Sequence, residues 1–447
     1  MPKYSRNFTQ KIFQLRFLNI ASAEMLFRPD FCIRFSSIAP RILRIIPKSI
    51  VADRTMNPIR RIVDMMKIEP NPAKKLIPLT IGDPTLHGNF LAPDHINSRI
   101  HTILSSFKYN GYPHACGNKE AREAVARTHS PPSHPVGVDD VILACGCSQA
   151  IDMAISVLAN PGEHNILLPR PGFSLYQTLC NSKGIETRFY SLDPEKLWES
   201  DIEEMGSLID SKTSAILVNN PSNPCGSNFS RSHIQAILRV AEKHQIPIIA
   251  DEIYEKMVFG DEQYTSFAEM SDNVPILHVG GLAKQYMVPG WRLGWIVLHD
   301  RHGQLEDVRK GLMDLSTLTL GPTSFVQSIV PDLLEKTRKE YYDQVNKQLE
   351  GNVDVIRNGL SGATGLHVIE PQGAMYVMVG IDTEKLGVKD DVEFSQRLIT
   401  EESVFVLPGQ VFQMPNFVRI VITSPKPILT EACDRIRAFC ERLANKA

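Results

Sequence analysis

SAILVNN (Ser214–Asn220) and PIIAD (Pro247–Asp251) are two short apolar runs, rich in β-branched residues, with a stretch of helical pattern between them. Short apolar runs bounded by turn residues are typical of strands that are buried on both faces. Strands separated by helical segments are joined by crossovers, which make the strands parallel. These two runs therefore predict an α/β fold with a mostly parallel sheet.

The same alternation extends outward along the chain in both directions. Five more strands are predicted, at VILAC (141–145), NILLP (165–169), IETRFY (185–190), ILHVGG (276–281) and GWIVL (294–298). With the first two runs they make a seven-stranded, mostly parallel sheet that helices cover on both faces. We assign this sheet to a large α/β domain over residues 96–335.

A smaller domain is predicted beyond it, over residues 336–447. A polar helical stretch precedes three further strands, GAMYVMVGI (373–381), VFVLPG (404–409) and FVRIVIT (417–423), and a final helix. This pattern predicts an α+β domain, and we expect the segment 51–95 to pack on it. A cleft between two domains is the usual place for a small ligand.

The composition excludes several classes of protein. The 447 residues are 43% hydrophobic and 22% charged, with a formal net charge of −2, which gives no indication of a nucleic acid partner. No apolar run is long enough to span a bilayer. The eight cysteines and thirteen histidines are scattered without metal-ligand spacing, so we expect a reduced, intracellular protein with neither disulfide nor metal.

The first fifty residues differ from the rest. They contain nine Lys or Arg and only two acids, with apolar residues interleaved through QKIFQLRFLNI (10–20). A basic, acid-poor segment of this kind is typical of a mitochondrial transit peptide, and it predicts the mitochondrial matrix. The alternative is a basic tail on a cytoplasmic enzyme. No compact apolar core indicates a secretory signal.

Ligands of open α/β sheets bind at the carboxyl ends of the strands, where this chain carries unusual residues. In CGCSQA (145–150) a strand runs into Gly146 and then into a helix, so the N–H groups of Cys147 and Ser148 can stabilise an anion. Many similar turns bind nothing, and alone this one is a weak signal.

Lys284 and Arg292 lie in GGLAKQYMVPGWRLGW (280–295), a stretch made mostly of apolar residues and glycines. A buried guanidinium needs a counter-charge, and no acid is near in sequence, so we expect an anionic ligand at Arg292. A lysine in a desolvated site is nucleophilic enough to form an imine. The alternative is that both are surface charges on a loop.

Asp251 directly follows the buried run PIIA. A carboxylate there is costly unless it meets a cation such as a protonated pyridine nitrogen. Tyr254 and Asn223 can reach the same ligand, although both also fit ordinary turn chemistry. Together with the lysine and the anion site, the aspartate indicates pyridoxal phosphate. No nucleotide-binding G-x-x-x-x-G-K is present, and no G-x-G-x-x-G follows a strand.

The order of these motifs resembles the fold-type I, class I pyridoxal-phosphate-dependent aminotransferases, over nearly the whole chain beyond the leader. The resemblance is carried by TIGDPT (80–85), KYNGY (108–112), CGCSQA (145–150), LPRPGFSLY (168–176), NNPSNPCGS (219–227), ADEIY (250–254), GGLAK (280–284), VPGWRLGW (288–295), GAMY (373–376) and NFVRI (416–420).

By this resemblance, Lys284 would bond the cofactor and later move the substrate proton. Asp251 would pair with the ring nitrogen, and Phe173 would stack on the ring. Tyr254 and Asn223 would bind the ring hydroxyl oxygen.

The resemblance also implies which residues hold the anionic groups. Arg292 and residues 146–148 (Gly146, Cys147 and Ser148) would hold the phosphate, and Tyr112 would reach the phosphate of a neighbouring subunit in a homodimer. Arg419 would clamp the substrate α-carboxylate bidentately, assisted by the Gly82 backbone.

The chain departs from the family pattern in a few places. Cys145 stands where serine is usual, Gln285 stands where arginine is common, and LPGQVF (407–412) differs as well. None of these changes removes an essential group.

The activity implied is a ping-pong transfer of an amino group from L-tyrosine, and from other aromatic amino acids, to 2-oxoglutarate. The products would be 4-hydroxyphenylpyruvate and L-glutamate. Carbon–sulfur lyases and aminocyclopropane-carboxylate synthases share such a site and stay alternatives, as does an aminotransferase of broad specificity. A DNA-binding regulator that senses the cofactor is disfavoured, because no DNA-binding domain fits in the leader.

Overall fold

The computed structural model describes residues 46–66 and 68–446, and the chain from Lys48 onward forms one compact unit. Nearly all of the predicted leader lies outside the described residues. None of the helices in the described part is long and apolar enough to cross a membrane.

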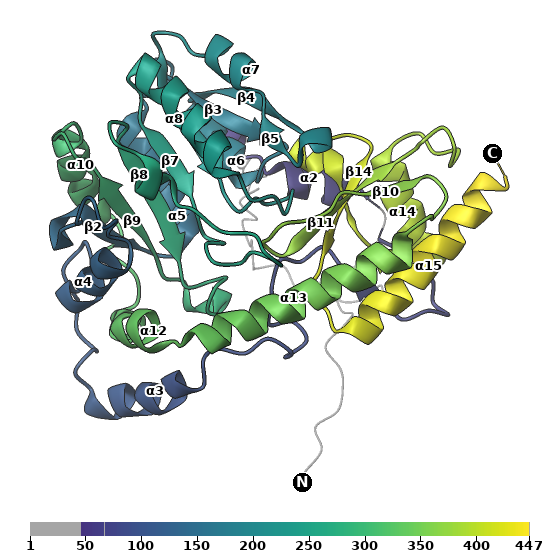
Figure 1. Ribbon diagram of the computed structural model, residues 1–447, viewed down its shortest axis with the longest axis horizontal. Helices are drawn as coiled ribbons and strands as arrows, with labels where there is room; N and C mark the ends of the chain where they lie inside the picture. The colour runs from purple at the N-terminus through teal and green to yellow at the C-terminus, as the bar shows by residue number, and fades with distance from the viewer. Residues whose placement is uncertain (1–45, 67, 447) are drawn as a thin grey trace, which may run out of the picture. The chain divides into compact units, whose positions relative to one another are not determined.

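The large sheet confirms the predicted α/β fold and has eight strands (Figure 1). In spatial order they are β2 (Val141–Ala144), β9 (Gly294–His299), β8 (Ile276–Gly281), β7 (Ile248–Asp251), β6 (Thr213–Asn219), β3 (Asn165–Arg170), β4 (Glu186–Asp193) and β5 (Glu199–Ser200). All seven predicted strands are present. The eighth, β5, is an edge strand of two residues, too short to show as an apolar run.

Strand direction brings the chemically unusual residues to one edge. The strands β4, β3, β6, β7 and β8 pair in parallel, whereas β9 is antiparallel to both β8 and β2. Strand β2 therefore runs the same way as the parallel strands. The carboxyl ends of β2, β3, β6, β7 and β8 lie at the same edge, together with the beginning of β9.

The central strands are buried on both faces, which explains their continuous apolar runs. On β6, Ala215 and Leu217 join one core cluster, and Ile216 and Val218 join another on the opposite face. The helices of the large domain are α3 (His95–Ser106), α4 (Lys119–Thr128), α5 (Cys147–Leu158), α6 (Leu175–Lys183), α7 (Ile202–Ser207), α8 (Arg231–His244), α9 (Phe267–Met270), α10 (Glu306–Ser316), α11 (Ser324–Gln327) and α12 (Val330–Lys336).

The predicted small α+β region is built on an antiparallel sheet. Its strands, in spatial order, are β10 (Leu366–Val368), β11 (Tyr376–Ile381), β14 (Phe417–Val421) and β13 (Leu407–Pro408). The helices α13 (Lys339–Leu360), α14 (Asp391–Glu402) and α15 (Lys426–Ala444) bury apolar residues against it. Figure 1 shows α13 and α15 side by side, one long helix against the other.

The N-terminal segment joins this smaller region. Strand β1 (Ile77–Pro78) pairs in parallel with β12 (Val404–Phe405). Helix α1 (Ile50–Arg54) precedes α2 (Pro58–Met65), which begins at the cap Asn57 and lies against the 3₁₀ helix η4 (Gly409–Phe412). The domain limits drawn from the sequence stay predictions.

Gly294, the first residue of β9, is a test of this packing. A Cβ there would lie 2.4 Å from the backbone nitrogen of Cys147 and 2.8 Å from the carbonyl oxygen of Gly280. We expect Gly294→Ala to lower the free energy of unfolding by about 1–3 kcal/mol, because rigid backbone must shift. Urea denaturation measures this. Gly290→Ala is the control, since nothing lies within 4 Å of its Cβ position; equal stability of the two variants would contradict the packing.

Candidate functional site

A cavity of about 780 Å³ lies at the strand edge where the unusual residues gather. Its walls come from the large sheet, from the smaller region and from the N-terminal segment. Of the residues predicted from the sequence, it is lined by Gly82, Cys147, Ser148, Phe173, Asn223, Asp251, Tyr254, Lys284, Arg292 and Arg419.

Lys284 follows β8 and is half-buried at the cavity wall. Its Nζ donates a hydrogen bond of 2.6 Å to the carbonyl oxygen of Gly82. No described carboxylate forms an ion pair with it. The lysine is therefore an amine held by one neutral acceptor, facing a ligand cavity and free to react.

An anion site is formed by the beginning of α5 and by Arg292. Gly146 precedes α5 with φ of 82°, and in the described chain the N–H groups of Cys147 and Ser148 have no hydrogen-bond acceptor. A Cβ on Gly146 would lie 2.6 Å from Nη2 of Arg292, so only glycine lets the guanidinium approach this turn. Unbonded N–H groups at a helix N-terminus beside an arginine are typical of phosphate binding.

Arg292 differs from the sequence expectation in its burial. It is exposed at the rim of the cavity rather than buried, because it follows the 3₁₀ helix η3 (Pro289–Trp291) in a left-handed conformation with φ of 50°. Its described hydrogen bond goes to the carbonyl oxygen of Pro289, at 3.1 Å. No acid among the described residues forms an ion pair with Arg292.

Asp251 ends β7 inside the cavity wall and is only 3% exposed. Its carboxylate accepts hydrogen bonds from the Tyr176 hydroxyl at 2.6 Å, the backbone N–H of Ile253 at 3.2 Å and the Cys147 thiol at 3.6 Å. Burial raises the pKa of Asp251, and these donors oppose the rise. A cation in the cavity would keep the carboxylate ionised.

Aromatic side chains surround this carboxylate. The Tyr254 hydroxyl is 2.7 Å from the Tyr376 hydroxyl, and burial, followed by the field of Tyr376, raises the pKa of Tyr254. Phe173 lines the cavity and contacts Tyr176 edge to face, with 5.6 Å between ring centroids. The site thus has an aromatic wall beside the acid.

Arg419, on β14, carries a positive charge into the interior with a side chain only 4% exposed. It donates to Asn223 Oδ1 and to the Thr80 carbonyl oxygen, each at 2.8 Å. Its Nε has no hydrogen-bond partner in the part of the chain that the structure describes. Its guanidinium lies 4.4 Å from the ring centroid of Tyr376. No described acid pairs with it, and burial lowers its pKa.

Gly82 lines the cavity, where its carbonyl oxygen accepts a hydrogen bond from Lys284, and its part in binding the substrate carboxylate stays a prediction. Thr80 supplies the backbone carbonyl oxygen that accepts from Arg419. Tyr112 is 91% exposed and does not line the cavity, so its contact with a neighbouring subunit stays a prediction.

Three contributors to the site were not identified from the sequence. Tyr176 and Tyr376 lie in the motifs LPRPGFSLY and GAMY, where an aromatic residue is indistinguishable from a residue of the hydrophobic core. Thr80 contributes only its backbone carbonyl, which any residue type could supply. A buried tyrosine needs a partner for its hydroxyl, and that need is the signal that could have singled out both.

Known proteins with similar sequences bear on what this constellation does. The profile of the class I and II aminotransferases matches residues 74–436. The tyrosine aminotransferase of Mus musculus is 50% identical over 394 residues, which are 88% of this chain and 87% of that protein. An S-alkyl-thiohydroximate lyase of Arabidopsis thaliana is 34% identical over 378 residues, 83% of this chain and 82% of that protein.

A solved structure shares the fold. The crystal structure of tyrosine aminotransferase from Leishmania infantum superposes with a TM-score of 0.85 at 39% identity, covering 90% of this chain and 99% of that chain. Sequence and fold therefore agree on the family.

Proposed function

The chain belongs to the class I and II aminotransferases, and we propose that it transfers the amino group of L-tyrosine to 2-oxoglutarate. The products are 4-hydroxyphenylpyruvate and L-glutamate, and other aromatic amino acids are donors as well. The two half-reactions alternate at one site, so the first product leaves before the second substrate binds.

The observation that carries this proposal is the buried guanidinium of Arg419. It shares a cavity with Lys284 and Asp251, and among the described residues it has no carboxylate partner. A buried cation without a counter-charge is costly, and an α-carboxylate removes the cost when it binds. Amino acids and 2-oxo acids both carry this group, so one clamp serves both substrates.

Pyridoxal 5'-phosphate fits the remaining groups of the cavity. The cradle of Gly146, Arg292 and the α5 N-terminus suits a phosphate, and Asp251 suits a protonated ring nitrogen. Phe173 offers a ring to stack on. When bound, this cofactor withdraws electrons from the substrate Cα.

Four residues of the site then have separate roles in the transfer. Arg419 fixes the carboxylate and so orients the Cα–H bond toward Lys284. The Lys284 amine would take that proton from the substrate Cα and return it to the cofactor carbon that receives the amino group. Asp251 keeps a proton on the ring nitrogen, and Tyr176 holds Asp251 in place through its 2.6 Å hydrogen bond.

An aromatic donor is supported by the apolar side chains of the N-terminal segment. Ile59, Val63, Ile68, Leu76 and Ile81 line the cavity beyond the polar groups. A wall of this kind stabilises a phenol ring through apolar burial.

Steady-state assays with tyrosine, phenylalanine, aspartate and cystine test this function. We expect glutamate to form only when 2-oxoglutarate is present, with the aromatic donors preferred. Lys284→Ala should lose nearly all turnover, whereas the exposed Lys212→Ala should keep it. Products that form without 2-oxoglutarate would instead indicate a carbon–sulfur lyase.

The two arginines are expected to fail in different ways. Arg292→Ala removes a charge-assisted hydrogen bond of about 1.5–3 kcal/mol, so cofactor affinity should fall about tenfold or more, with partial rescue by excess cofactor. Arg419→Ala should spare cofactor binding while kcat/KM for the amino acid collapses. Arg419→Lys should also be poor, because an ammonium lacks the planar two-point contact.

Cofactor titration beside half-reaction kinetics measures both losses, with the exposed Arg338→Ala as control. A loss of cofactor affinity in Arg419→Ala with intact amino-acid turnover would reverse the two roles.

We further propose a homodimer in which Tyr112 completes the partner's phosphate site, and delivery to the mitochondrial matrix by the basic leader. The exposed Tyr112 and the nine basic residues of the leader support these proposals. Sedimentation should return a dimer, and residues 1–50 fused to a reporter should direct it to mitochondria. A monomer would contradict the first proposal, and a diffuse cytosolic reporter would contradict the second.

A further inference from the structure

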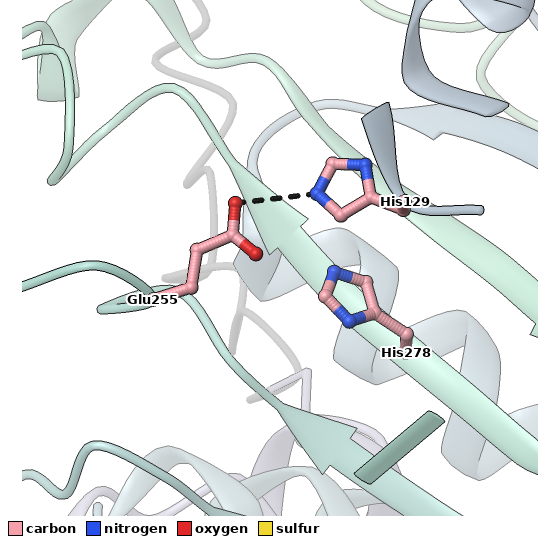
Figure 2. A group of neighbouring side chains, drawn as sticks. All are labelled: His129, Glu255 and His278. Atoms are coloured by element: carbon pink, nitrogen blue, oxygen red, sulfur yellow. Dashed lines mark hydrogen bonds and ion pairs between the residues drawn. The ribbon is translucent and has the colours of Figure 1, made fainter. Parts of the chain in front are cut away.

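Three buried side chains outside the reaction cavity converge on one point of the large domain. His129 follows α4, Glu255 lies in the loop after β7, and His278 lies on β8. Figure 2 shows the three side chains turned toward one another. One nitrogen or oxygen from each lies within 4.8 Å of the other two, and none of the three residues lines the cavity.

The two histidines use the same ring nitrogen, Nδ1, for a hydrogen bond to a supporting oxygen. His129 Nδ1 is 2.9 Å from the Val125 carbonyl oxygen, and His278 Nδ1 is 2.8 Å from Glu252 Oε2. Both partners are acceptors, so both Nδ1 atoms carry the hydrogen. In the neutral imidazoles the Nε2 atoms present lone pairs, which is the arrangement that metal-binding histidines adopt with their supporting oxygens.

Among the described residues the Nε2 of His278 has no hydrogen-bond partner, although the residue is only 1% exposed. A buried polar atom without a partner is costly, and native structures avoid it unless the atom binds something. The Nε2 of His129 lies 3.2 Å from Glu255 Oε1, a spacing that two ligands of one metal ion adopt.

Charge also favours a divalent ion at this point. Glu252 and Glu255 are both buried, and the ion pairs that the structure describes for them are with these two histidines. If both histidines are neutral, two carboxylate charges stay uncompensated in the interior. One divalent cation balances both.

We propose that His129, His278 and Glu255 bind a divalent metal ion, zinc, with a fourth ligand from solvent. Neutral imidazoles and a carboxylate are ligands that zinc prefers. The three ligand atoms lie within 4.8 Å of one another, and they would close around the ion to zinc–ligand distances of about 2.0–2.2 Å. The side chains of His129 and Glu255 are 5% and 8% exposed, so the site is buried.

The site would be structural. The bound ion would link three segments of the large domain: the end of α4, strand β8 and the loop after β7. Lys284 follows β8, and Tyr254 lies in the loop after β7. The sequence expectation of no metal rested on spacing along the chain, and here His129 and Glu255 are 126 residues apart.

Cobalt binding to the full chain with its cofactor tests the proposal. After dialysis against a chelator, we expect one Co²⁺ per chain, a visible absorption band typical of four-coordinate cobalt, and displacement by Zn²⁺. Glu255→Gln and His278→Asn should each weaken binding by about tenfold or more. The exposed His302→Asn should bind as the unmodified chain does, and the cysteines are unchanged in every variant.

X-ray absorption at the zinc edge identifies the atoms that bind the ion. It uses the unmodified chain, so it tests the proposal even if the variants fold poorly. Two imidazoles and oxygen ligands are expected, and zinc should raise the melting temperature. The absence of the cobalt band, sulfur ligands at the zinc edge, or equal affinity in folded Glu255→Gln would overturn the proposal.

Discussion

The buried positive charge of Arg419 is the constraint on which the rest of the site depends. Its guanidinium has two hydrogen-bond acceptors and two aromatic faces, but no carboxylate among the described residues. A fold that holds a cation in this way carries a cost that only an anionic ligand removes. The unpaired guanidinium therefore favours a ligand that carries a carboxylate. Lys284 and Asp251 line the same cavity, where such a substrate would react.

The sheet explains why these groups meet. Reversal of β9 restores β2 to the direction of the parallel strands, so the anion-binding turn at Gly146 lies at the same edge as Asp251 and Lys284. The smaller region then brings Arg419 to this edge on β14. Positions far apart in sequence become one site through strand direction and through the packing of two regions.

Much of this could be predicted from the sequence, because each buried strand is a continuous apolar run and most of the unusual residues lie at the end of such a run or just beyond it. Arg419 was visible as a lone arginine among apolar neighbours. Exposure of Arg292 was not visible, since it depends on a left-handed turn. Thr80 acts through its backbone, and the partners of His129, Glu255 and His278 are set by tertiary contacts. Pairings across a hundred residues leave no local pattern.

The most direct measurement is a crystal structure of the chain with pyridoxal phosphate and 3-(4-hydroxyphenyl)propionate, which is tyrosine without its amino group. The phosphate should contact Arg292 and the N–H groups of Cys147 and Ser148, the carboxylate should contact Arg419, and the phenol should lie against the apolar N-terminal segment. A carboxylate bound away from Arg419, or a phosphate bound to it, would contradict the assignment of the two anion sites.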